Sequence, residues 1–180
     1  MTAYLNALGV ICALGRDKHE VARNLFAGDC SGLRVEAGWV AERALPVASV
    51  TGALAPIPET LAAHGSRNNQ LLLEAGLQIR AEIDRAIQAY GGARIGIVLG
   101  TSTSGIDEAS QGIAHYLREQ RFPDGYDYQQ QELSAPANFL SDWLGLSGPS
   151  YVISTACTSS ARALMSARRL LDLRLCDAVL

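Results

Sequence analysis

A cysteine at the junction of a strand and a helix is the feature of this sequence that most clearly suggests chemistry. Cys157 stands in the segment GPSYVISTACTSSARAL, where a strand predicted over Tyr151–Ser154 gives way to a helix predicted over Ser159–Leu173. The first N–H groups of a helix lack intrahelical partners and carry partial positive charge, so they stabilise a thiolate. A thiol at this position is expected to be nucleophilic at neutral pH. Its own backbone N–H is also an expected oxyanion donor to a thioester carbonyl, which indicates acyl transfer.

Small residues surround Cys157 on both sides. They keep the turn tight and leave room for a substrate: Thr155, Ala156, Thr158, Ser159, Ser160 and Ala161. The other cysteines have no such context, and we expect Cys12, Cys30 and Cys176 to be buried thiols. The cysteines form no CxxC pair, and no histidine stands near them at metal-ligand spacing, so the pattern does not indicate a metal site.

The elements that would position Cys157 alternate between helix and strand. Arg94–Gly100 (RIGIVLG) is predicted to be a strand buried on both faces, because its apolar run barely alternates. The small-residue turn Thr101–Gly105 (TSTSG) follows, and a helix is predicted over Ile106–Glu119. This order favours an α/β domain with parallel strands.

The remaining segments supply further elements. We expect a strand over residues 3–12, helices over Asp17–Ala27, Asn69–Tyr90 and Ala135–Leu144, and a last strand beginning at Asp177. Residues 31–66 show no clear period and are interrupted by prolines, so a long irregular excursion is expected there. The apolar side of the Ser159–Leu173 helix is predicted to hold Ala161, Leu164, Met165 and Leu171.

Composition limits the classes of function. The chain is 48% hydrophobic and 18% charged, which is typical of a globular domain with a core. Its net charge is -3, with no run rich in lysine and arginine, which argues against nucleic-acid binding. No apolar run approaches the ~18 residues that a membrane span needs, and the N-terminus lacks the basic region of a signal peptide. We therefore expect a cytoplasmic protein without a membrane span.

Several segments resemble those of one enzyme family and stand in that family's order. GPSYVISTACTSSARAL resembles the active-site segment of β-ketoacyl-acyl-carrier-protein synthases, and its TAC triplet is the specific signal. The supporting segments are GVICALGRDKHEVARNLFAGDCSGL, RIGIVLGTSTSG and FLSDWLGLSGPS. Ser160 departs from the family, which usually has glycine there, and its hydroxymethyl group would narrow the pocket. RNNQLLL and GTSTSGIDEAS further resemble synthases of bacterial aryl-polyene pigment clusters.

The resemblance implies a thiolase-like α/β fold, in which a mixed five-stranded sheet is covered by helices. Residues 1–180 would supply an incomplete first half of that fold, without the C-terminal half. The implied reaction is a decarboxylating Claisen condensation with malonyl-acyl carrier protein, in which Cys157 carries the acyl group. The resemblance implies neither a cofactor nor a metal. The implied partners are an acyl carrier protein and a second synthase subunit, either identical or synthase-like.

The resemblance also suggests secondary sites. It implies a substrate pocket lined by Thr103, Ser104, Thr155 and Thr158. A tight turn without a substrate role is an equally good interpretation of the segment that holds Thr103 and Ser104. Arg67 is a candidate contact for the acidic carrier protein, although an ordinary solvated arginine is the simpler interpretation.

The family's two catalytic histidines lie well beyond the nucleophilic cysteine. His19, His64 and His115 match neither position and receive no catalytic role. This fragment alone is therefore expected to be inactive in condensation.

Two other functions stay open at the level of sequence. A non-catalytic partner subunit of the chain-length-factor type is one, although such subunits usually replace the nucleophilic cysteine. A cysteine hydrolase that pairs Cys157 with His115 is the other, and it requires the two side chains to lie side by side.

Overall fold

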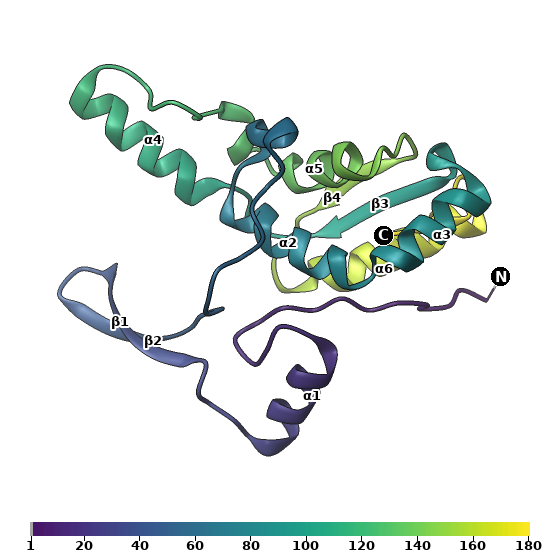
Figure 1. Cartoon of the computed structure of the whole chain (residues 1–180), viewed down its shortest axis with the longest axis horizontal. Helices are drawn as coiled ribbons and strands as arrows, with labels where there is room; N and C mark the ends of the chain where they lie inside the picture. The colour runs from purple at the N-terminus through teal and green to yellow at the C-terminus, as the bar shows by residue number, and fades with distance from the viewer. Residues whose placement is uncertain (1) are drawn as a thin grey trace.

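A parallel sheet built around one apolar strand forms the centre of the molecule. The computed structural model describes residues 2–180, and its strand order here is β4-β3-β5. The strands are β3 (Ile95–Gly100), β4 (Ser150–Ile153) and β5 (Ala178–Val179). Both neighbours run parallel to β3. Figure 1 shows β3 in the centre of this part of the molecule, with β4 beside it. The predicted α/β class with parallel strands is confirmed, and the described residues form three parallel strands where the resemblance implies a mixed sheet of five.

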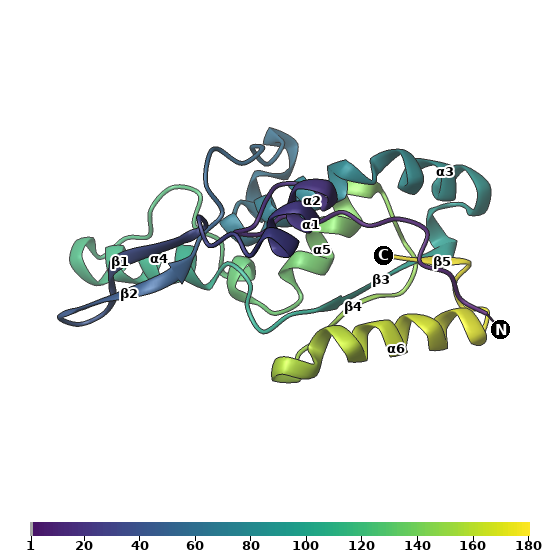
Figure 2. The same cartoon turned by 90° about the horizontal axis from the view of Figure 1, so that it is seen from below.

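Helices cover both faces of this sheet. One face carries α2 (Arg67–Gln78), α3 (Arg80–Tyr90) and α5 (Ala135–Leu144), and the opposite face carries α6 (Ser159–Asp172), as Figure 2 shows. Ile97 packs with Phe139 on the first side, whereas Val98 packs with Leu170 on the second. Alternate side chains of β3 thus enter two separate cores, which is why its sequence reads as a continuous apolar run.

The sheet-facing side of α6 agrees with the prediction at Leu171, which packs against the second core, and differs from it at the other positions. Ala163 and Leu170 are buried against the sheet, whereas Leu164 and Met165 are more than half exposed. The prediction followed the larger apolar side chains. Ala163 and Leu170, two turns apart on α6, instead join Val98 in the second core.

The long helix predicted over residues 69–90 is two helices. α2 ends and α3 begins around Ile79, whose φ of -116° and ψ of 16° are not helical. Both helices contact the indole of Trp143 on α5. A Cβ on Gly76 would lie 2.7 Å from that ring, and the guanidinium of Arg80 lies 5.3 Å from its centroid. The break allows α2 and α3 to pack around one large side chain that comes from a distant part of the sequence.

Residues 3–12 are extended but do not form the predicted strand. Their backbone is paired through the side chain of Gln78, which accepts from Val10 N at 3.1 Å and donates to Val10 O at 2.9 Å. Gly9 lies directly against the backbone of Ala75, where a Cβ would be 2.0 Å from the carbonyl oxygen. The segment therefore packs along α2, and the apolar run that suggested a strand is largely exposed.

The segment expected to be irregular contains a β-hairpin. β1 (Leu33–Val40) pairs antiparallel with β2 (Arg43–Ala48), and a short 3₁₀ helix, η1 (Glu59–His64), follows. Pro46 lies within β2, which is tolerated in a two-stranded sheet because each strand has a free edge. Val35 and Trp39 are 75% and 67% exposed, so no core imposes the alternation that would have predicted these strands.

Two further helices agree with the predictions, α1 (Lys18–Ala27) and α4 (Ile106–Glu119). Three short 3₁₀ helices were not predicted: η2 (Gly92–Arg94), η3 (Tyr128–Gln131) and η4 (Ala156–Thr158). Asp17 caps α1 by accepting from His19 N and Glu20 N, and Gly28 ends it with φ of 67°. The ring of Tyr116 in the last part of α4 stacks on Phe122, which in turn stacks on Tyr126. Within residues 2–180, no helix has the length and apolarity required to cross a membrane.

An ion pair ties the start of β3 to the start of β5 and predicts a pH effect on stability. Arg94 Nε lies 2.7 Å from Asp177 Oδ2, and this hydrogen bond lowers the pKa of Asp177 below the usual 3.8. The folded-state pKa is depressed, so the stabilisation is present above pH 3.8 and is lost as the pH falls further. We expect Asp177→Asn to lower the melting temperature at neutral pH, and the difference from the parent to vanish in acid. An equal difference at both pH values would contradict this.

Candidate active site

Cys157 lies where the sequence predicts, between the carboxyl end of β4 and the start of α6. It occupies the middle of η4, a single 3₁₀ turn, and its side chain is exposed. β3 ends beside β4, with Gly100 opposite Ile153, and Thr101 N donates to Ile153 O at 3.2 Å. The turn after β3 and the turn that carries Cys157 therefore meet at the same edge of the sheet.

Hydroxyl groups of the segment itself shape the turn around Cys157. Ser159 Oγ accepts from Thr155 N at 2.9 Å and donates to Ala156 O at 2.7 Å, and the residue is only 4% exposed. Thr158 Oγ1 donates to Thr155 O at 2.8 Å and lies 2.9 Å from Thr155 Oγ1. These bonds satisfy backbone groups that the irregular turn leaves outside a helix or sheet ladder.

The backbone next to the nucleophile is left-handed. Ala156 has φ of 53°, a region that an L residue with a Cβ enters only at a cost of roughly 1–2 kcal/mol. The surrounding hydrogen bonds hold it there, and the result is a sharp change of direction just before Cys157. Sharp turns of this kind project a side chain away from the sheet, which fits the exposure of the thiol.

One glycine allows this turn to sit against the sheet. A Cβ on Gly100 would lie 2.5 Å from Ser159 C, 2.6 Å from Ser159 O and 2.6 Å from Ser160 N. The last residue of β3 therefore touches the backbone at the start of α6, and only a residue without a side chain fits. Sequence analysis missed this role, although the small-residue turn that follows Gly100 pointed to the region.

The comparison with protein families decides the identity of this arrangement. The family described as "Beta-ketoacyl synthase, N-terminal domain" matches residues 6–180. The chain belongs to the β-ketoacyl synthase family. Among curated proteins, the search found no match.

Solved structures support the assignment to the β-ketoacyl synthases. A ketosynthase (ApeO), solved in complex with its chain length factor (ApeC) from Xenorhabdus doucetiae, is 39% identical with a TM-score of 0.91. The match covers 98% of this chain and 45% of that one, so the chain spans less than half of the solved structure's length.

More distant structures share the fold. A β-ketoacyl synthase from Burkholderia phymatum STM815 is 22% identical with a TM-score of 0.73. The match covers 92% of this chain and 42% of the Burkholderia chain. The ishigamide ketosynthase/chain length factor is 18% identical with a TM-score of 0.70, and the match covers 92% of this chain and 43% of the ishigamide chain.

The other suggested pocket residues have different surroundings in this β-ketoacyl synthase chain. Thr103 is exposed, and its N–H donates to Thr101 Oγ1 at 3.1 Å, which closes a tight turn. Ser104 is buried, and its hydroxyl donates to Gln131 O at 2.8 Å, so it fastens η3 to the turn after β3. Thr155 and Thr158 lie beside Cys157, with hydroxyls that bond each other.

Arg67 is the first residue of α2 and is exposed. Its backbone N–H donates to Glu108 at 2.6 Å, and its guanidinium donates to Val50 O at 3.1 Å. The side chain is thus positioned by the backbone ahead of η1 and remains accessible on the surface.

None of the three histidines of residues 2–180 is brought to Cys157. His19 lies in the first turn of α1, and His64 Nε2 lies 2.7 Å from Asp142 Oδ2. His115 lines a groove beside α4 together with Glu108, Arg118 and Tyr126, and Cys157 is not part of that groove. The arrangement gives no support to a hydrolase that pairs Cys157 with His115.

The environments of the other cysteines correct one prediction. Cys176 is buried, and its burial raises the pKa of its thiol. Cys12 is half-buried, and Cys30 is exposed rather than buried because it lies in the turn beyond the end of α1, outside both cores. Residues 2–180 hold no group of three metal-binding side chains.

Proposed function

We propose that this chain provides the acyl-accepting part of a decarboxylating β-ketoacyl synthase, with Cys157 as the nucleophile. The observation that carries the proposal is an exposed cysteine in a constrained turn at the start of α6. The family match and the 39% identity to a ketosynthase support it. The resemblance of RNNQLLL and GTSTSGIDEAS favours the aryl-polyene type.

In the proposed first step, the Cys157 thiolate attacks the carbonyl carbon of an acyl thioester on a carrier protein. The developing oxyanion accepts a hydrogen bond from the Cys157 N–H. The bond between the acyl carbon and the carrier's sulfur then breaks, and the carrier leaves as a thiol after gaining a proton. The product is an acyl group held as a thioester on Cys157.

In the proposed second step, a malonyl carrier protein loses its carboxylate as carbon dioxide. The electron pair of the broken bond stays on the α-carbon, which attacks the acyl carbonyl and releases Cys157 as a thiolate. The resemblance attributes this step to histidines that lie beyond the cysteine in the family. The residues of this chain therefore account for acyl loading and for the leaving group of the condensation.

We also propose assembly with a second synthase-like subunit through β4. This strand lies at the edge of the described sheet, where its outer backbone groups have no strand partner. The ketosynthase at 39% identity is described in complex with a chain length factor, which favours a heterodimer over two identical copies. The presence of Cys157 supports the proposal that this chain is the catalytic member of such a pair, because chain-length factors usually replace that cysteine. The exposed guanidinium of Arg67 remains the proposed contact for an acidic carrier protein.

Alkylation rates test the proposed nucleophile directly. We expect iodoacetamide to modify Cys157 at least about tenfold faster than Cys30, because both thiols are exposed but only Cys157 lies at the start of a helix. Cys176 should react last, since it is buried. Peptide mapping by mass spectrometry after timed quenching measures each rate. Equal rates at Cys157 and Cys30 would refute the assignment.

A further inference from the structure

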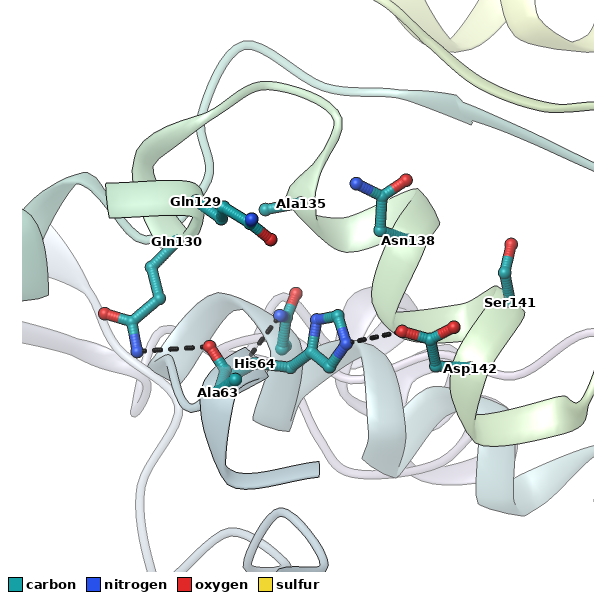
Figure 3. A pocket seen from close by; sticks show the side chains of 9 residues that line it. Ala63, His64, Gln129, Gln130, Ala135, Asn138, Ser141 and Asp142 are labelled. Atoms are coloured by element: carbon teal, nitrogen blue, oxygen red, sulfur yellow. Dashed lines mark hydrogen bonds and ion pairs between the residues drawn. The ribbon is translucent and has the colours of Figure 1, made fainter. Parts of the chain in front are cut away.

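A polar cavity lies between η1, η3 and α5, away from the turn of Cys157. Its volume is about 250 Å³. It is lined by Ala63, His64, Asn69, Gln129, Gln130, Ala135, Asn138, Ser141 and Asp142. Figure 3 shows His64 and Asp142 on one side of this space and the amides of Gln129 and Asn138 on the other. Most of the wall is polar, so the cavity suits a small polar ligand.

Asn69 lines the cavity and contains an unpaired, buried acceptor. The residue is 2% exposed, and its Nδ2 donates to His64 O at 2.9 Å. That bond fixes the orientation of the amide, because only the nitrogen can donate to a carbonyl. Asn69 Oδ1 is then left buried without a hydrogen-bond partner. A buried acceptor of this kind calls for a donor from outside the chain.

His64 offers a second acceptor. Its Nε2 lies 2.7 Å from Asp142 Oδ2, and an ionised carboxylate only accepts, so the proton of a neutral His64 is on Nε2. In that neutral tautomer the other ring nitrogen, Nδ1, is an acceptor, and Figure 3 shows it turned toward the space below Gln129 and Asn138. The carboxylate of Asp142 adds negative charge beside His64, in the wall of the same cavity.

We propose that this cavity binds a small primary amine in its protonated, ammonium form. An ammonium group brings three N–H donors, which suit Asn69 Oδ1 and His64 Nδ1, and a positive charge that suits Asp142. An anion would meet two acceptors and a carboxylate. The site lies apart from Cys157, which is not among the residues that line it.

Calorimetric titration of the purified protein with methylammonium chloride tests this proposal, in a buffer that contains no amine. We expect saturable binding, and no binding of tetramethylammonium, which has the same charge but no N–H donor. Asp142→Asn should weaken methylammonium binding roughly tenfold, the scale of one charge-assisted interaction. Asp84→Asn on α3 is the matched control, because Asp84 is an equally exposed partner of an ion pair outside the cavity.

Asn69→Leu should abolish binding, and circular dichroism establishes whether that variant folds. If it does not fold, the Asp142→Asn comparison decides alone, because Asp142 is largely exposed and its replacement leaves the core intact. Equal binding of the two ammonium ions, no saturable binding, or equal affinity in the Asp142→Asn and Asp84→Asn variants would overturn the proposal. So would a crystal structure with methylammonium that held only water at Asn69 Oδ1.

Discussion

Replacement of Cys157 by alanine is expected to abolish acyl loading, the largest effect of any single substitution in this chain. Without the thiol no covalent acyl-enzyme forms, because Cys157 is the one cysteine of the turn at the start of α6 and the nearby Thr155, Thr158 and Ser159 hydroxyls bond within the turn. Incubation with an acyl carrier-protein thioester, followed by intact-mass measurement, should show the added acyl mass in the parent and none in Cys157→Ala. The same loss should appear when an acyl-coenzyme A thioester replaces the carrier protein.

Cys30→Ala is the matched control, because Cys30 is also exposed but lies in the turn beyond α1. It should load acyl groups at the parent rate. Cys157→Ala is expected to retain the parent's melting temperature, since the thiol is exposed and has no role in either core. Persistent acyl loading in a folded Cys157→Ala variant would assign the nucleophile to another residue.

Gly100→Ala is expected to be the next most damaging change, although this residue carries no reactive group. The new Cβ would lie 2.5 Å from Ser159 C, so either the end of β3 or the start of α6 must move. Overpacking of this kind costs about 1–3 kcal/mol of folding free energy. The shift is also transmitted to Cys157 through η4, and a displacement near 1 Å can reduce the rate about 100-fold. We therefore expect slow acyl loading in a folded but less stable variant.

Gly28→Ala separates this effect from the general cost of replacing a glycine. Gly28 ends α1 with a positive φ, and a Cβ there meets nothing within 4 Å. That variant should lose stability and yet load acyl groups at the parent rate. Chemical denaturation gives the free energy of unfolding for each variant, and the initial rate of acyl loading gives the activity. Parent-like loading by Gly100→Ala would show that the contact with Ser159 does not position the nucleophile.

Elements that serve the two cores could be predicted from the sequence. The strand at Ile95–Gly100 and the strand-turn-helix order around Cys157 follow from an apolar run and from a cluster of small residues. Those signals are local, and the structure agrees with them. The position of Cys157 belongs to this class, because the junction between a strand and a helix is marked by residues next to it in the sequence.

What sequence reasoning missed depends on contacts between distant segments. The break at Ile79 arises where α2 and α3 meet Trp143, and the pairing of residues 3–12 depends on Gln78. The hairpin from Leu33 to Ala48 has no buried face, so it lacks the alternation by which a strand is usually recognised. The unpaired acceptor of Asn69 is likewise visible only once η1 and α5 lie together.

The hydrogen bonds around Cys157 have a consequence for the order of folding. Ser159 and Thr158 bond to partners three or four residues away, so closing the turn requires little loop-closure entropy. The neighbouring strand β4 has a larger loop-closure cost, because its residues 150–153 must pair with residues 97–100 of β3. Contacts of such long sequence separation form slowly. The bend that exposes the thiol therefore depends on a few neighbouring residues and can form early. Its attachment to the sheet forms later, when the distant strands of the domain pair.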